Sequence, residues 1–186
     1  SAASDVYKRQ VYVFSFPKFH SDQVTLVYFG LIYVGIMLSF IYRVRTLENG
    51  FLLVWMIFIG AWGADTCAYL VGRKIGKHKM APVLSPKKSV EGLFGGILGA
   101  ALIGFLFATI LKGQLTSIKN PQLSFAIIGG CSAVISTIGD LAASAIKRNH
   151  EVKDYGTLIP GHGGILDRFD SIIFTAPIVY YLLQVL

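Results

Sequence analysis

Five long apolar segments constrain the fold of this 186-residue chain more than any other feature. A membrane-spanning helix needs about 20 predominantly apolar residues, and continuous rather than alternating apolarity indicates helices rather than barrel strands. Charged residues make up only 15% of the chain, against roughly 25% in soluble domains. We therefore expect an all-α fold, a polytopic transmembrane helical bundle with about five spans. These spans cover residues 24–42, 51–71, 93–111, 125–146 and 172–186.

The beginning of the chain differs from the rest. Residues 1–20 do not start with methionine, and their apolar stretch at 11–16 is too short to cross a membrane. We expect residues 1–20 to be extraneous or the remnant of a helix missing from an N-terminally truncated chain. Residues 21–186 are expected to form a single transmembrane domain.

Basic residues concentrate in two segments. The chain has 17 Lys and Arg against 10 Asp and Glu, and ten of these basic residues lie within 73–91 and 147–168. Cytoplasmic loops of membrane proteins are enriched in Lys and Arg, so we expect both segments to be cytoplasmic. Arg43 and Arg45 would then lie on the opposite side, which conflicts mildly with that rule. In a membrane protein, the positive charge favours anionic lipid or an anionic substrate over nucleic acid.

Two carboxylates interrupt the apolar segments: Asp65 in the second and Asp140 in the fourth. An ionisable residue within a span is costly and indicates a functional site, although a carboxylate held by an interhelical hydrogen bond near a helix end is the alternative. Asp140 also begins a polar stripe whose spacing of 4, 3, 4 and 3 places it on one helix face. This stripe predicts a helix that extends from the membrane into the cytoplasm. It consists of Asp140, Ser144, Lys147, Glu151 and Asp154.

A glycine-rich segment and a carboxylate pair follow. His162 lies within 160–164, Pro-Gly-His-Gly-Gly, whose backbone amides can approach a phosphate closely. Asp167 and Asp170 are three residues apart, so on a helix they share a face. Carboxylates at this spacing suit an oxygen-ligated cation such as Mg²⁺, and Arg168 between them is available for a phosphate. We predict a cavity that opens to the cytoplasmic side between the second, fourth and fifth spans.

The first basic segment contains a second candidate phosphate site. Residues 85–96, expected as part of the first basic loop, combine Lys87, Lys88 and Ser89 with three glycines that allow close backbone approach. The order of residues is not that of a P-loop. Lys87, Lys88 and Ser89 are suited to hold a polyphosphate. The alternative is a cytoplasmic loop that contacts anionic lipid head groups.

These segments together resemble the signature of the phosphatidate cytidylyltransferase family, also called CDP-diacylglycerol synthases. The matching residues lie at 144–148, 153–154 and 160–170, and two further blocks at 65–77 and 85–92 are also similar. The resemblance extends from about residue 60 to the end of the chain. Members of this family have more transmembrane helices than the five segments here, which agrees with truncation at the start.

The resemblance implies an integral-membrane nucleotidyltransferase. It would convert CTP and phosphatidate to CDP-diacylglycerol and pyrophosphate in phospholipid biosynthesis, with Mg²⁺ and a second cation such as K⁺. Its active site would face the cytoplasm at a bacterial inner membrane, and the glycine-rich third span suggests a homodimer. The catalytic residues are expected to be Asp140, Asp167, Asp170 and Lys147, with the three aspartates as metal ligands. The expected substrate-binding residues are Lys87, Lys88, Ser89, Ser144, Arg148, Lys153, His162, Arg168 and Asp65.

Two other functions stay open. A CTP-dependent polyisoprenol kinase would use a similar nucleotide site, but it would transfer the γ-phosphoryl group, so product analysis separates it from a cytidylyltransferase. A cation-coupled transporter would use Asp65 and Asp140 to bind cations or relay protons. A transporter needs no basic, glycine-rich segment beside a carboxylate pair, and it should show a repeat symmetry that this sequence lacks.

Overall fold

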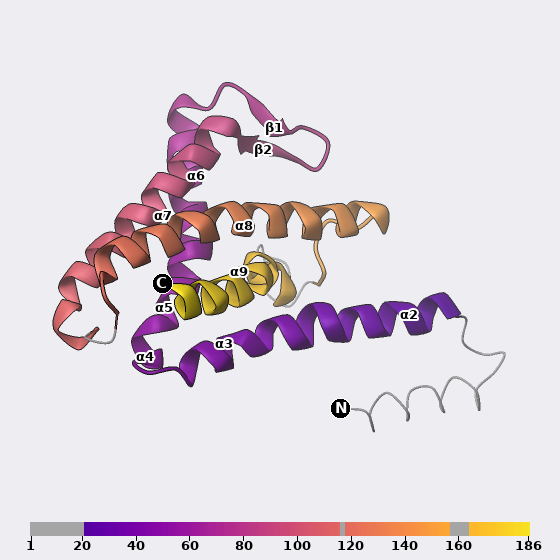
Figure 1. The fold of residues 1–186 in the computed structure, drawn as a ribbon. Coiled ribbons are helices and arrows are strands. Elements are labelled where there is room, and N and C mark those ends of the chain that lie inside the picture. The colour runs from indigo at the N-terminus through magenta and orange to yellow at the C-terminus, as the bar shows by residue number, and fades with distance from the viewer. Residues whose placement is uncertain (1–20, 116–117, 157–163) are drawn as a thin grey trace. The chain divides into compact units, whose positions relative to one another are not determined.

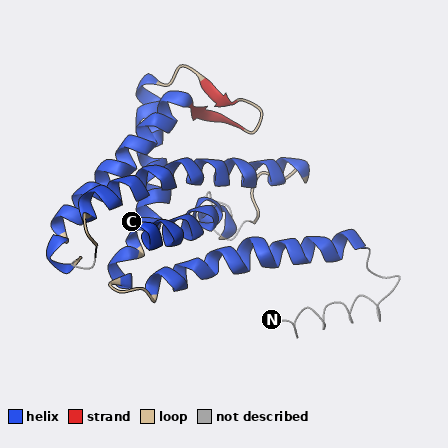
Figure 2. Ribbon diagram, in the orientation of Figure 1, coloured by secondary structure: helices blue, strands red, loops and turns tan. Residues whose placement is uncertain are grey.

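The computed structural model describes residues 21–115, 118–156 and 164–186 (Figure 1). The described residues are mainly helical, with a single two-stranded hairpin (Figure 2). The chain divides into two compact units, Ser1–Met37 and Leu38–Leu186. In the first unit, α2 (Ser21–Gly30) continues into a π-helical stretch, η1 (Leu31–Ile36), and this segment buries none of its described side chains. The all-α expectation is confirmed.

The second unit contains the remaining elements. Helix α3 (Met37–Arg45) leads into α4 (Gly50–Leu53), α5 (Trp55–Phe58), the π-helical η2 (Ile59–Gly63) and α6 (Ala64–Ile75). The hairpin follows, with antiparallel strands β1 (Lys79–Ala81) and β2 (Ser85–Ser89). The last elements are α7 (Val90–Ile110), the short 3₁₀ helix η3 (Lys112–Gln114), α8 (Pro121–Asn149) and α9 (Leu166–Val185).

Four helical segments of the described chain are long and apolar enough to cross a membrane. They are Gln23–Arg45, Gly50–Ile75, Val90–Ile110 and Pro121–Asn149, and they coincide with the first four expected spans. Helix α9 forms where the fifth span was expected, but it is not among the helices that are apolar enough to cross a membrane. Its first five residues, Leu-Asp-Arg-Phe-Asp, include three charges, which lower its hydropathy.

Small residues bring three of the helices into close contact. Gly92, Gly96, Ala100, Gly104 and Ala108 are buried along one face of α7. A Cβ on Gly96 would lie 3.0 Å from the carbonyl oxygen of Ala64 in α6, and one on Gly104 would lie 2.5 Å from that of Phe125 in α8. Helix α7 can therefore approach α6 and α8 this closely only because Gly96 and Gly104 have no side chain. The glycines thus serve packing inside the chain, and they no longer give a specific reason to expect a homodimer.

The segment 85–96 is not a loop, in contrast to the sequence expectation. Its first part is strand β2, and helix α7 begins at Val90. The reason is the N-cap at Ser89, whose hydroxyl accepts a hydrogen bond of 3.1 Å from the backbone N–H of Gly92. Glu91 closes the hairpin by accepting the backbone N–H groups of Lys77 and His78. Its carboxylate also contacts His78 Nδ1 at 2.6 Å.

The polar stripe on α8 ends earlier than its spacing predicted. Helix α8 stops at Asn149, and Glu151 adopts a left-handed conformation with φ of 55°. The backbone N–H of Val152 then bonds back to the carbonyl of Lys147 at 3.0 Å, which is a common way to terminate a helix. The prediction that Glu151 and Asp154 continue the helical face is therefore wrong, whereas Asp140, Ser144 and Lys147 do lie on α8.

Candidate active site

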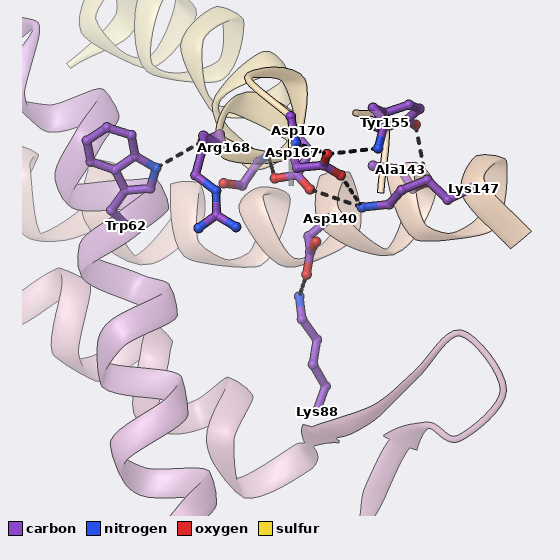
Figure 3. Close-up of polar contacts among 11 residues, drawn as sticks. Trp62, Lys88, Asp140, Ala143, Lys147, Tyr155, Asp167, Arg168 and Asp170 are labelled. Atoms are coloured by element: carbon purple, nitrogen blue, oxygen red, sulfur yellow. Dashed lines mark hydrogen bonds and ion pairs between the residues drawn. The ribbon is translucent and has the colours of Figure 1, made fainter. Parts of the chain in front are cut away.

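Two groups of ion pairs bring the hairpin, α8 and α9 together (Figure 3). Lys88 of β2 reaches Asp140 of α8, with Nζ 2.5 Å from Oδ2. Lys147, two turns further along α8, lies 2.9 Å from Oδ1 of Asp167 and 3.9 Å from Oδ2 of Asp170. Side chains from segments far apart in the sequence therefore meet along one stretch of α8.

Asp167 is held by three N–H donors. Besides Lys147 Nζ, the backbone N–H groups of Tyr155 and Gly164 donate to its Oδ2 at 2.8 and 2.9 Å. Its position in the first turn of α9 precedes the apolar segment 172–186. Burial raises the pKa of the Asp167 carboxyl, but the hydrogen bonds from Lys147 and the two backbone groups outweigh this, so its pKa lies below the ordinary value. Asp167 is therefore a fixed anion that ties the start of α9 to α8.

Asp170 lies against Asp140. Its side chain is buried, and its Oδ1 accepts the backbone N–H of Ser171 at 2.8 Å. Burial and, next, the charge of the nearby Asp140 raise the pKa of its carboxyl. Two adjacent carboxylates repel one another unless they share a proton or a cation. This pair is therefore a donor set that fits a cation such as Mg²⁺.

The three predicted metal ligands do not form one cluster. In the described part of the chain, no group of three or more His, Cys, Asp or Glu side chains is arranged to hold a metal ion. Asp167 is already occupied by Lys147 and two backbone N–H groups. The geometry thus places Asp140 and Asp170 together and gives Asp167 a different environment.

A cavity of about 490 Å³ adjoins the Lys88–Asp140 pair. Its described lining comes from α6, the hairpin, the start of α7 and α8, whereas the sequence predicted a cavity that included α9. The second and fourth spans do contribute, as expected. Its charged lining consists of Asp65, Arg73, Lys79, Lys87, Lys88 and Asp140.

The other expected site residues are spread around these two groups. Asp65 lines the cavity from α6, and Lys87 is exposed beside it on β2. Ser89 also lines the cavity, but its hydroxyl oxygen caps α7. Ser144 is half-buried on α8, and Arg148, Lys153 and Arg168 are exposed beyond or beside the carboxylates. His162 lies outside the described residues.

Two aromatic residues belong to the site although no sequence pattern pointed to them. Tyr155 donates its hydroxyl to the carbonyl of Ala143 at 3.2 Å, and Lys147 Nζ lies 5.2 Å from the centre of its ring. Burial raises the pKa of the Tyr155 hydroxyl. Trp62, in the π-helical turn η2, donates its indole N–H to the carbonyl of Arg168 at 3.2 Å. These contacts orient Lys147 and the first turn of α9.

The sequence of this chain is similar to those of known proteins. The profile of the family described as "Cytidylyltransferase family" matches residues 6–186. The phosphatidate cytidylyltransferase of Bacillus subtilis is 37% identical over 166 residues, which are 89% of this chain and 60% of that protein. The enzyme of the same name from Thermotoga maritima is 38% identical over 160 residues, 84% of this chain and 58% of that protein. That of Synechocystis sp. is 43% identical over 138 residues, 74% of this chain and 45% of that protein.

The chain thus spans about half the length of the curated relatives it matches, between 45% and 60% of these three. The family profile nevertheless covers both ion-pair groups, the hairpin and the four long apolar helices. The chain belongs to the cytidylyltransferase family.

Proposed function

We propose that this chain forms the catalytic part of a membrane enzyme that joins CTP and phosphatidate into CDP-diacylglycerol, with release of pyrophosphate. The names of its relatives support the reaction. The observation that carries the proposal is the group of basic and acidic side chains on the hairpin, α8 and α9, directly beside apolar helices. A lipid with a charged head group needs such a site, because its tails stay in the apolar region while its phosphate meets a water-soluble nucleotide.

The reaction requires charge compensation more than a strong base. The phosphate of phosphatidate is already an anion at neutral pH. One of its oxygens forms a bond to the α-phosphorus of CTP, and the bond from that phosphorus to the oxygen bridging to the β-phosphorus breaks. The bridging oxygen leaves with pyrophosphate and keeps the electron pair. Such transfers depend mainly on positioning and on electrostatic stabilisation.

The residues of the cavity supply that charge. Arg73, Lys79, Lys87 and Lys88 line it and can hold phosphate oxygens of two polyanions that would otherwise repel one another. Lys147 has a separate task in this proposal. It fixes Asp167 and stands near Asp170, so the start of α9 keeps its place beside α8.

The proposed cofactor is Mg²⁺, with K⁺ as a second cation. Asp140 and Asp170 fit a divalent cation, since the two carboxylates are close enough for their charges to interact and would be stabilised by a shared positive charge. Asp167 is proposed as a further ligand on the basis of the family resemblance. When bound, the metal would supply positive charge to phosphate oxygens. The cytoplasmic orientation of the site is part of this proposal and rests on the basic segments.

Product analysis with labelled CTP tests the proposal. The purified chain in detergent micelles with phosphatidate and Mg²⁺ is expected to transfer label from [α-³²P]CTP to lipid and to release pyrophosphate. Label from [γ-³²P]CTP should appear only in pyrophosphate. Lipid labelled from the γ position would instead identify a kinase. Absence of both products from a folded protein that accumulates cations in vesicles would favour a transporter.

A further inference from the structure

Lys88 is held by a single partner in an environment where an ammonium group needs several. Its Nζ is buried, and among the described residues no acceptor is oriented to hydrogen-bond with it, although Asp140 Oδ2 lies 2.5 Å away. An ammonium group has three N–H donors. The contact with Asp140 therefore occupies at most one of these donors and leaves at least two for a further acceptor, which a buried ammonium group needs.

The cavity beside this pair offers a place for the missing acceptors. Its volume of about 490 Å³ is within the roughly 300–1,000 Å³ range of small-molecule sites. Among the cationic residues that line the cavity in the described structure, Lys88 forms an ion pair with a lining carboxylate, that of Asp140. A polyanion in this cavity would offer Lys88 several oxygens. It would have to compete with Asp140 for the Lys88 ammonium group.

Two positive groups can also compete for Asp140. Asp170 of α9 lies near Asp140 (Figure 3), and the other ammonium beside Asp170, Lys147 Nζ at 3.9 Å, is already paired with Asp167, so departure of Lys88 would leave Asp140 without its ion-pair partner. That arrangement attracts a cation. Lys88 and a divalent cation are thus alternative partners for the same carboxylate.

We propose that Lys88 is an exchangeable counter-ion, which neutralises Asp140 in the absence of nucleotide and moves to the phosphates when a nucleoside triphosphate binds. Its departure opens Asp140 to the divalent cation. The inference rests on the proposed function for the identity of the two ligands. It adds that nucleotide and metal bind with positive coupling, and that metal alone binds weakly. Thermodynamic linkage requires this coupling to be the same in both directions.

Metal binding without nucleotide tests the exchange with a readout that is independent of turnover. Mn²⁺ binding to the purified chain would be measured by electron paramagnetic resonance for the parent, Lys88→Gln, Lys87→Gln and Asp140→Asn. Lys88→Gln is expected to bind Mn²⁺ at least about 5-fold more tightly than the parent, the lower end of typical coupling. Lys87→Gln is the matched control, because it removes the same charge from the same cavity without breaking the ion pair. Its change should be much smaller.

A second measurement follows the nucleotide. CTP binding in the presence of EDTA should weaken in Lys88→Gln, whereas Lys88→Arg, which keeps the charge, should resemble the parent in both assays. Size-exclusion profiles and circular dichroism establish that each variant is folded.

The possible failures separate the exchange from the metal assignment. Equal Mn²⁺ affinities in Lys88→Gln and Lys87→Gln, with weakened binding in Asp140→Asn, would overturn the exchange and leave the metal at Asp140. Weaker Mn²⁺ binding in Lys88→Gln would mean that Lys88 only holds Asp140 in place. Unchanged Mn²⁺ affinity in Asp140→Asn would overturn both the exchange and the proposed metal site.

Discussion

Lys147 Nζ lies 2.9 Å from Asp167 Oδ1, and this contact joins the last turns of α8 to the first turn of α9. The two side chains retain only 11% and 4% exposure. Most of the free energy of such a pair appears when one partner is lost, since the other is left charged and buried. We therefore expect a substitution of one partner to destabilise the protein more than a substitution that removes both charges.

Lys147→Met should destabilise the protein. Loss of one partner of a buried pair typically costs about 3–5 kcal/mol, and we expect the lower end because some solvent reaches Lys147. The double variant Lys147→Met/Asp167→Asn should recover part of that loss, since it removes both charges. Thermal unfolding in detergent measures Lys147→Met, Asp167→Asn and the double variant. Strictly additive losses would show that the two groups do not interact.

Asp140→Asn and Asp167→Asn should each nearly abolish turnover while the protein still inserts and folds. In our proposal the first removes an anionic metal ligand, and the second removes a further proposed ligand that also holds α9 in place. Mn²⁺ binding should weaken in both. Glu151→Gln is a suitable control, because Glu151 is an exposed carboxylate that lies beyond the end of α8. An aspartate variant with near-normal turnover and normal metal dependence would identify that aspartate as structural.

Ser89→Ala should lower stability more than it lowers nucleotide affinity. The hydroxyl caps α7, and loss of an N-cap costs about 1 kcal/mol. Ser85→Ala on the same strand lacks this capping role and should be nearly silent in unfolding experiments. The discriminating measurement is CTP affinity at a temperature where both variants are folded. A large loss of affinity at unchanged stability would assign Ser89 to substrate binding instead.

Cysteine labelling tests the orientation of the basic segments. Single cysteines at Lys77 and Lys153 should react with a membrane-impermeant maleimide from the same side, because both segments are expected to be cytoplasmic. A cysteine at Lys119, between α7 and α8, should react from the opposite side. Reaction of the Lys77 and Lys153 positions from different sides would contradict the topology.

Gly104→Leu should prevent the close contact of α7 and α8. A Cβ at this position already lies 2.5 Å from the carbonyl oxygen of Phe125, which is backbone and cannot move aside easily. Gly113→Leu is the control, because nothing lies within 4 Å of a Cβ built there. We expect loss of folded protein for the first and little change for the second, measured as the monodisperse fraction after solubilisation.

The sequence was sufficient for the features that depend on local composition. Apolar runs of the right length predicted four spans, and isolated charges within or beside them singled out Asp140, Asp167 and Asp170. The end of α8 was beyond such reasoning, since polar spacing continued to Asp154 while the backbone turned at Glu151. A serine before an apolar run is an N-cap signal, and at Ser89 this signal was assigned to phosphate binding.

The partners of the charged residues could not be read from the sequence. Lys88 and Asp140 lie on elements that meet only after α6, α7 and α8 have packed. Lys147 lies two helical turns from Asp140, about 10 Å along the axis, which is too far for a direct pair, and the structure gives Lys147 to Asp167 and Asp170. Trp62 and Tyr155 had no distinguishing pattern in a chain with 13% aromatic residues.

The elements that carry Lys88 and Asp140 differ in how firmly they are held. Asp140 belongs to a 29-residue helix, whereas Lys88 lies in the second strand of a hairpin whose first strand has three residues. An isolated two-stranded hairpin is marginally stable in water. The amide protons of this hairpin should therefore exchange with deuterium through small, frequent openings, while those in the middle of α8 should exchange only on much larger unfolding events. If the two residues separate, we therefore expect Lys88 to move with the hairpin while Asp140 keeps its position on α8.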